Sequence, residues 1–124
     1  MTDERVLVDT NVLVHHINGD KRIERLLQDR TIHISYVTEV ELLSFPGYTP
    51  DEREAVKKWL RGFIVSGAEE GIRSIAIDLR VRFRMKLADA FVAATASYLS
   101  TPLLTEDKHF KKLKADIVLR LVEA

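Results

Sequence analysis

The sequence predicts an α/β fold with a mainly parallel central sheet covered by helices on both faces. Short continuous apolar runs, typical of strands buried on both faces, occur at residues 6–8, 32–35, 102–104 and 117–122. Stretches with helical apolar spacing separate these runs, and this alternation favours a parallel sheet. The chain has 124 residues, of which 46% are hydrophobic. We therefore expect one core and a single domain over residues 1–124.

The first elements are predicted from the amino-terminal half. The strand at residues 6–8 ends at Asp9, and a helix should begin near Asn11. A second helix should begin after Thr49, because Pro50 then takes the first helical position and Glu52 completes a capping box. Residues 63–65 can either finish that helix or form a short strand.

Two more helices are predicted from the second half of the chain. The first carries an apolar stripe and the second a stripe of small residues that permits close packing. The stripes are Ile72, Ile75, Ala76, Leu79 and Phe83, followed by Ala90, Ala93, Ala94 and Ser97. Residues 66–71 form the only linker-like segment.

Composition excludes several classes of function. Basic and acidic residues each number 19, so the net charge neither predicts nor excludes a polyanionic partner. The absence of cysteine rules out disulfides and thiolate metal sites. The first apolar run breaks at Asp9, too early for a signal peptide or a membrane span, so we expect a cytoplasmic protein. No Walker loop, nucleophile elbow or zinc-type histidine spacing occurs.

Four acids are predicted to meet at one edge of the sheet. Asp9 and Asp107 follow strands, and Glu41 and Asp89 are expected at helix starts. In parallel α/β sheets these positions share the edge where ligands bind. Their charges would repel one another unless a cation lay between them, and an oxygen-only donor set favours Mg²⁺ or Mn²⁺. Such an ion suits hydrolysis of a phosphodiester bond.

Four motifs carry a resemblance to a known family. They read LVDTNVLV, TEVELLS, KLADAFVAATA and LLTEDKHFKKL, in this order along nearly the whole chain. The sequence resembles the PIN-domain ribonucleases, most closely the VapC-type toxins of toxin–antitoxin pairs. The resemblance implies a three-layer α/β/α fold and a divalent-metal-dependent endoribonuclease that cleaves RNA. It also implies a cognate antitoxin and a homodimer.

The resemblance also assigns roles by position. It makes four acids the catalytic, metal-holding set, and it gives two polar residues a supporting role around the first acid. The acids are Asp9, Glu41, Asp89 and Asp107, and the supporting residues are Asn11 and Thr105. Ala88 stands where many relatives have proline, a change that removes no ligand.

Each acid also has an ordinary structural interpretation. Asp9 can cap a helix, Asp89 can complement a helix dipole, and Asp107 can be a turn residue. Glu41 can close a capping box with Thr38, and Glu39 competes with Glu41 for the functional role. Periodicity does not separate the two glutamates, and only the resemblance selects Glu41.

Basic residues flank two of the acids, where they are either a solvated face or contacts to RNA phosphates. They are Arg80, Arg82, Arg84 and Lys86 before Asp89, and Lys108, Lys111, Lys112 and Lys114 after Asp107. The helix around Trp59, residues 51–63, is a candidate dimer face or antitoxin groove.

The main alternative to a nuclease is a non-catalytic PIN-like module that binds RNA or acts as a scaffold. A phosphatase of the haloacid-dehalogenase type is disfavoured, because it needs a second aspartate where Asn11 stands. A phosphoreceiver is disfavoured because Asp51 and Asp78 have helical contexts.

Overall fold

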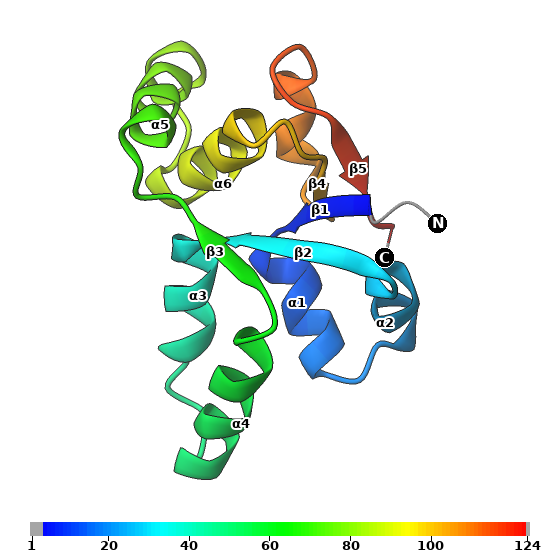
Figure 1. Cartoon of the computed structure of the whole chain (residues 1–124). Coiled ribbons are helices and arrows are strands. Elements are labelled where there is room, and N and C mark those ends of the chain that lie inside the picture. Colours follow the sequence, from blue (N-terminus) through cyan, green and yellow to red (C-terminus); the bar gives the residue numbers. More distant parts are fainter. Residues whose placement is uncertain (1–3, 124) are drawn as a thin grey trace.

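Five strands form one parallel sheet in the structure, a computed structural model that describes residues 4–123. The strand order is β3-β2-β1-β4-β5, and every neighbouring pair is parallel. The strands are β1 (Glu4–Val8), β2 (Arg30–Ser35), β3 (Ile64–Ser66), β4 (Leu103–Thr105) and β5 (Leu119–Leu121). The predicted parallel α/β architecture is thus confirmed, with the first strand at the centre of the sheet (Figure 1).

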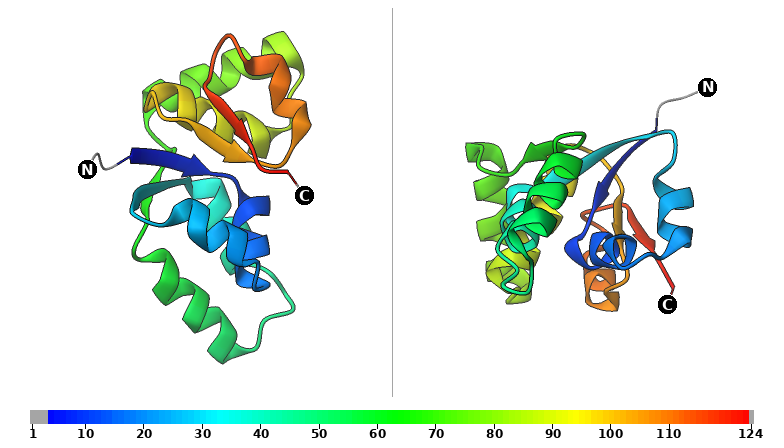
Figure 2. Two further views of the ribbon diagram at one scale, coloured as in Figure 1. Left: turned by 90° about the vertical axis from the view of Figure 1, so that its right-hand side faces the viewer. Right: turned by 90° about the horizontal axis from the view of Figure 1, so that it is seen from below.

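Helices cover both faces of the sheet, which gives three layers (Figures 1 and 2). One face carries α1 (Thr10–Ile17), α2 (Lys21–Leu27), α3 (Tyr36–Leu43) and α4 (Pro50–Leu60). The other carries α5 (Glu70–Phe83), α6 (Leu87–Tyr98) and the 3₁₀ helix η1 (Lys108–Leu113). Side chains alternate along β1, with Leu7 in the core under α5 and α6 and with Val6 and Val8 in the core under α1 to α4.

Several local predictions are confirmed. The capping box between Thr49 and Glu52 forms at the start of α4, with Pro50 as the first helical residue. Residues 64–66 leave the helix as β3 and pair with β2. Of the linker-like segment, only residues 67–69 remain outside regular elements. There Gly67 takes a φ of 143° against the Tyr36 ring, a conformation that glycine adopts without strain.

The start of α3 differs from the prediction. We expected Glu41 at a helix start, and this is wrong; the alternative capping box between Thr38 and Glu41 does not form either. Ser35 ends β2 and caps α3 directly, because its Oγ accepts the backbone N–H of Val37 at 3.2 Å. The helix therefore begins at Tyr36, and Glu41 lies in its second half.

Two short helical elements were not predicted. The seven residues of α2 are rich in charge and bury only Ile23 and Leu27, so the sequence shows no apolar stripe there. The η1 helix likewise buries only Phe110 and Leu113. Within residues 4–123, no helix is long and apolar enough to span a membrane.

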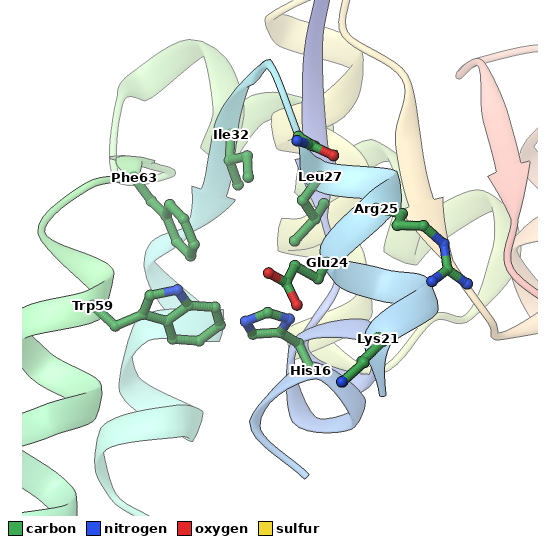
Figure 3. Close-up of a pocket in the computed structure, with 9 residues that line it drawn as sticks. His16, Lys21, Glu24, Arg25, Leu27, Ile32, Trp59 and Phe63 are labelled. Carbon is green, nitrogen blue, oxygen red and sulfur yellow. The ribbon is translucent and has the colours of Figure 1, made fainter. Parts of the chain in front are cut away.

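Trp59, on the helix expected to form the dimer or antitoxin face, is half-buried and packs against the core beneath α1 to α4. Its indole stacks on the His16 ring at 5.0 Å between centroids and meets Phe63 edge to face (Figure 3). Val56 and Leu60 of the same helix are buried in the core beneath α1 to α4. Most of this apolar stripe therefore serves the fold.

Candidate active site

Asp9 lies where the central strand ends. Its backbone N–H donates to the Leu104 carbonyl of β4 at 2.9 Å, so the two neighbouring strands hold it in place. α1 begins at the next residue, and Asp9 is its N-cap. The residue is only 7% exposed, which is unusual for an acid that forms no ion pair within the described chain.

Hydrogen bonds fix the Asp9 carboxylate. The Thr105 hydroxyl donates to Oδ2 at 2.7 Å, and the Thr10 backbone N–H donates to Oδ1 at 2.8 Å. Asn11 donates its side-chain amide to Oδ2 at 3.4 Å, and its own Oδ1 accepts the Glu106 N–H at the same distance. The two predicted supporting residues, Asn11 and Thr105, therefore both contact Asp9 and join α1 to the end of β4.

Burial dominates the charge state of Asp9. Burial is the largest cause that raises the pKa of the carboxyl, and the charges of Asp89 and Glu41 add to it, so that the pKa reaches about 6. The hydrogen bonds from Thr105 and Thr10 act in the opposite direction, since they stabilise the carboxylate. Asp9 thus carries a charge that its surroundings satisfy only in part.

Glu41 reaches the site through a hydroxyl. The Thr10 hydroxyl donates to Glu41 Oε1 at 2.7 Å and lies 3.0 Å from the hydroxyl oxygen of buried Thr38. Glu41 is the glutamate of α3 whose charge raises the pKa values of both Asp9 and Asp89. The position of Glu39 brings no comparable link to Asp9 among the described contacts.

Asp89 and Asp107 face each other across the other side of the site. Asp89 lies in the first turn of α6, as predicted, and burial is the main cause of its raised pKa, followed by the charge of Asp107. Asp107 caps η1, and its Oδ1 accepts the backbone N–H of His109 at 2.9 Å. Its own N–H donates to the Thr105 hydroxyl at 3.1 Å. The structure therefore brings all four predicted acids to one edge of the sheet.

A hollow of about 430 Å³ opens beside Asp89 and Asp107. Part of the predicted basic rim lines it, namely Arg84, Lys86 and Lys112, together with His109. Other members of the basic runs have structural roles. Arg82, for example, forms ion pairs with Asp78 and Asp116, each at 2.8 Å. The hollow thus combines two acids with several cations, an arrangement that suits a phosphate chain next to a metal.

Sequence reasoning missed three contacts at the site. Thr10 connects Asp9 to Glu41, His109 lies 2.8 Å from Asp107, and His15 lies 2.9 Å from Glu106. Thr10 could have been noticed, because it lies between Asp9 and Asn11, the two site residues of the first motif. The contact between His15 and Glu106 could not, because it depends on how α1 packs beside the end of β4, whereas the contact between His109 and Asp107 is local to the start of η1.

The donor set suits a hard divalent cation. Carboxylate oxygens dominate the site, and two of the four acids have raised pKa values that a cation would lower. Within residues 4–123, no three acidic or histidine side chains are close enough to hold an ion directly. Mg²⁺ does not require that, because it keeps several of its waters and takes only one or two carboxylates.

Comparisons with known proteins identify the family. The PIN domain model matches residues 6–116. Among solved structures, a chain of a toxin–antitoxin complex from Klebsiella pneumoniae is 24% identical, with a TM-score of 0.83 over 96% of this chain and 99% of that one. A DNA-bound VapBC chain from Salmonella typhimurium is 18% identical (TM-score 0.79, 94% and 97% covered). A VapBC-5 chain from Mycobacterium tuberculosis is 21% identical (TM-score 0.70, 97% and 98% covered). No curated protein matches significantly. The family model covers most of the chain and the fold agrees, so this protein belongs to the PIN domain family.

Proposed function

We propose that this protein is a divalent-metal-dependent endoribonuclease and the toxin of a toxin–antitoxin pair. The observation that carries the proposal is the buried carboxylate of Asp9, whose pKa is raised to about 6 among three further acids. Retaining such a costly group at a strand end favours a role in binding a cation. Membership of the PIN domain family, which includes nucleases, supports the same conclusion.

The acids divide the work by position. Asp9 would bind Mg²⁺ or Mn²⁺ directly, and Asp89, Asp107 and Glu41 would hold it directly or through its waters. When bound, such an ion supplies a Lewis acid for the phosphate and a water of lowered pKa. Thr105 keeps Asp9 oriented and ionised, because its hydroxyl donates to the carboxylate.

The basic rim would position the substrate. Arg84, Lys86 and Lys112 line the hollow next to Asp89 and Asp107, so an RNA backbone lying there would bring a phosphate to the acids. Single-stranded RNA fits this open hollow better than a duplex, since its flexible backbone can follow a curved surface.

The partners in this proposal are an antitoxin and a second copy of the chain. The structural neighbours come from toxin–antitoxin complexes, which supports an antitoxin. A small apolar hollow of about 200 Å³ lies next to Glu41 and Thr10 and is lined by Val14, Phe45 and Tyr48. An apolar antitoxin side chain placed there would block the approach to Glu41.

The deciding experiment is cleavage of a mixed RNA pool by purified protein. We expect cleavage with Mg²⁺ or Mn²⁺, and none with EDTA or in Asp9→Asn. Asp51→Asn is the matched control, because Asp51 is an exposed acid in the first turn of α4, outside the acidic site, and it should cleave normally. If the folded, antitoxin-free wild type cleaves none of several RNAs with metal present, the non-catalytic RNA-binding or scaffold module replaces the nuclease.

A further inference from the structure

A second basic hollow lies on the sheet face that carries α2, outside the acidic site. Its volume is about 550 Å³, and its floor is apolar. Four arginines from three separate elements surround it: Arg22 and Arg25 of α2, Arg30 of β2 and Arg120 of β5. We call it the arginine hollow. Leu26, Leu104, Leu121 and Val122 form the apolar part of its lining.

Acidic neighbours leave many of its donors unused. Glu4 is shared by Arg120 at 2.5 Å and Arg30 at 3.6 Å, and Arg22 pairs with Asp20 at 2.9 Å. Arg25 has no ion pair within the described residues. Each guanidinium offers five N–H donors, so N–H groups of Arg25, Arg30 and Arg120 stay available, whereas Arg22 already donates to Asp20 and to the Glu123 carbonyl. Glu123 also lines the hollow, so its four arginines face three acids, Glu4, Asp20 and Glu123, and a net positive charge remains for phosphate.

Arg25 is turned toward this hollow. Arg25 lines both this hollow and the one beside the Trp59–His16 stack, and in Figure 3 its guanidinium points away from the two stacked rings. The two hollows therefore adjoin each other at Arg25 of α2.

The arginine hollow begins next to the acidic site. Arg22 donates to the Glu123 carbonyl at 2.8 Å, which fastens α2 to the chain just after β5 (Figure 1). The charge of Glu106 also acts on Arg22, and Glu106 directly precedes Asp107. From Arg22, the hollow extends toward Arg30 and Glu4. These two residues lie at the amino-terminal ends of β2 and β1, away from the edge of the sheet that carries the acidic site.

We propose that the arginine hollow binds the phosphate backbone of the RNA substrate on one side of the bond to be cleaved. This inference rests on the proposed function. An RNA strand leaving the acidic site past Glu106 would meet Arg22 first and the other arginines next. The guanidinium groups would hold its phosphates, and the leucine floor would receive the faces of unpaired bases. An acidic peptide matches the charge alone, whereas RNA also matches the apolar floor and the continuity with the site.

Binding of labelled single-stranded RNA in EDTA tests the proposal without any cleavage. The test variant is Arg25→Gln with Arg120→Gln, and the matched control is Lys57→Gln with Lys58→Gln, two exposed lysines of α4. For single strands, each phosphate contact makes the binding constant fall with about the 0.7 power of the salt concentration. At ~0.1 M salt, one contact therefore strengthens binding about fivefold relative to 1 M salt. The double variant should therefore bind about 25-fold more weakly, with a salt slope lower by about 1.4. The control should bind as the wild type does.

Arg25→Gln alone guards against a folding defect, because it breaks no ion pair, and it should lose about fivefold. If both arginine variants bind RNA like the wild type while wild-type protein cleaves RNA with Mg²⁺, this inference fails and the nuclease proposal stands. If the wild type neither binds nor cleaves RNA, both fail. If the arginine variants lose affinity only for an acidic polypeptide such as polyglutamate, the hollow is a protein-binding site and the RNA proposal is overturned.

Discussion

Replacing Asp9 with asparagine should change how the stability of the metal-free protein depends on pH. The pKa of Asp9 is raised from 3.8 to about 6 by burial. Between these values the unfolded chain has released its proton while the folded chain still holds it, so wild-type stability falls as pH rises through about 6. A difference of about 2 pKa units corresponds to about 3 kcal/mol. Asp9→Asn has no such proton and avoids that loss.

Urea unfolding with EDTA across pH measures the effect. The variant loses acceptors for Thr105 and Asn11, which costs about 1 kcal/mol at every pH. Its stability relative to wild type should nevertheless rise by up to about 3 kcal/mol between about pH 4 and pH 8. Asp20→Asn should show no such rise in this range, because Arg22 lowers the pKa of Asp20, which is therefore ionised in both the folded and the unfolded chain above about pH 4. A stability difference between Asp9→Asn and wild type that stays constant with pH would refute the buried, repelled carboxylate.

Three further substitutions test other parts of the structure. Thr105→Val should cost about 1 to 3 kcal/mol in urea unfolding and raise the pKa of Asp9, whereas Thr105→Ser should restore both. Neither ring nitrogen of buried His33 has a hydrogen-bond partner among residues 4–123, and burial followed by the charge of Arg5 lowers its pKa. Wild type should therefore lose stability as pH falls below about 6.5, and thermal unfolding should show that His33→Leu loses less. Glu41→Gln should slow RNA cleavage at least about tenfold while Glu39→Gln does not; equal loss in both would reject Glu41 as the site residue.

The sequence predicts the acids that follow strands or begin helices better than it predicts the contacts between them. Asp9 and Asp107 follow apolar runs, and the rule that parallel strands end at one edge brings them together without further information. Asp89 is equally accessible to prediction, since small residues at helical spacing mark α6. These inferences depend only on local pattern and on the architecture that it predicts.

Contacts that depend on packing were beyond reach. The environment of Glu41 depends on where α3 begins. Ser35 both ends β2 and caps α3, but the sequence offers an equally regular capping pattern that begins at Thr38. The arginine hollow joins residues from 22 to 120, and no motif links them. They meet because β1 is central and β5 is added at the far edge, which only the strand order reveals.

The hydrogen bond from Thr105 to Asp9 spans 96 positions of the chain. During synthesis, β1 emerges first but acquires β4 as its neighbour only after α6 has been made. Such a distant pairing folds late, because loop closure must precede it. A chain stalled before residue 103 would carry Asp9, Glu41 and Asp89 without the hydroxyl that orients the first of them. The acidic site of the proposed nuclease would thus be complete only when the last two strands had joined the sheet.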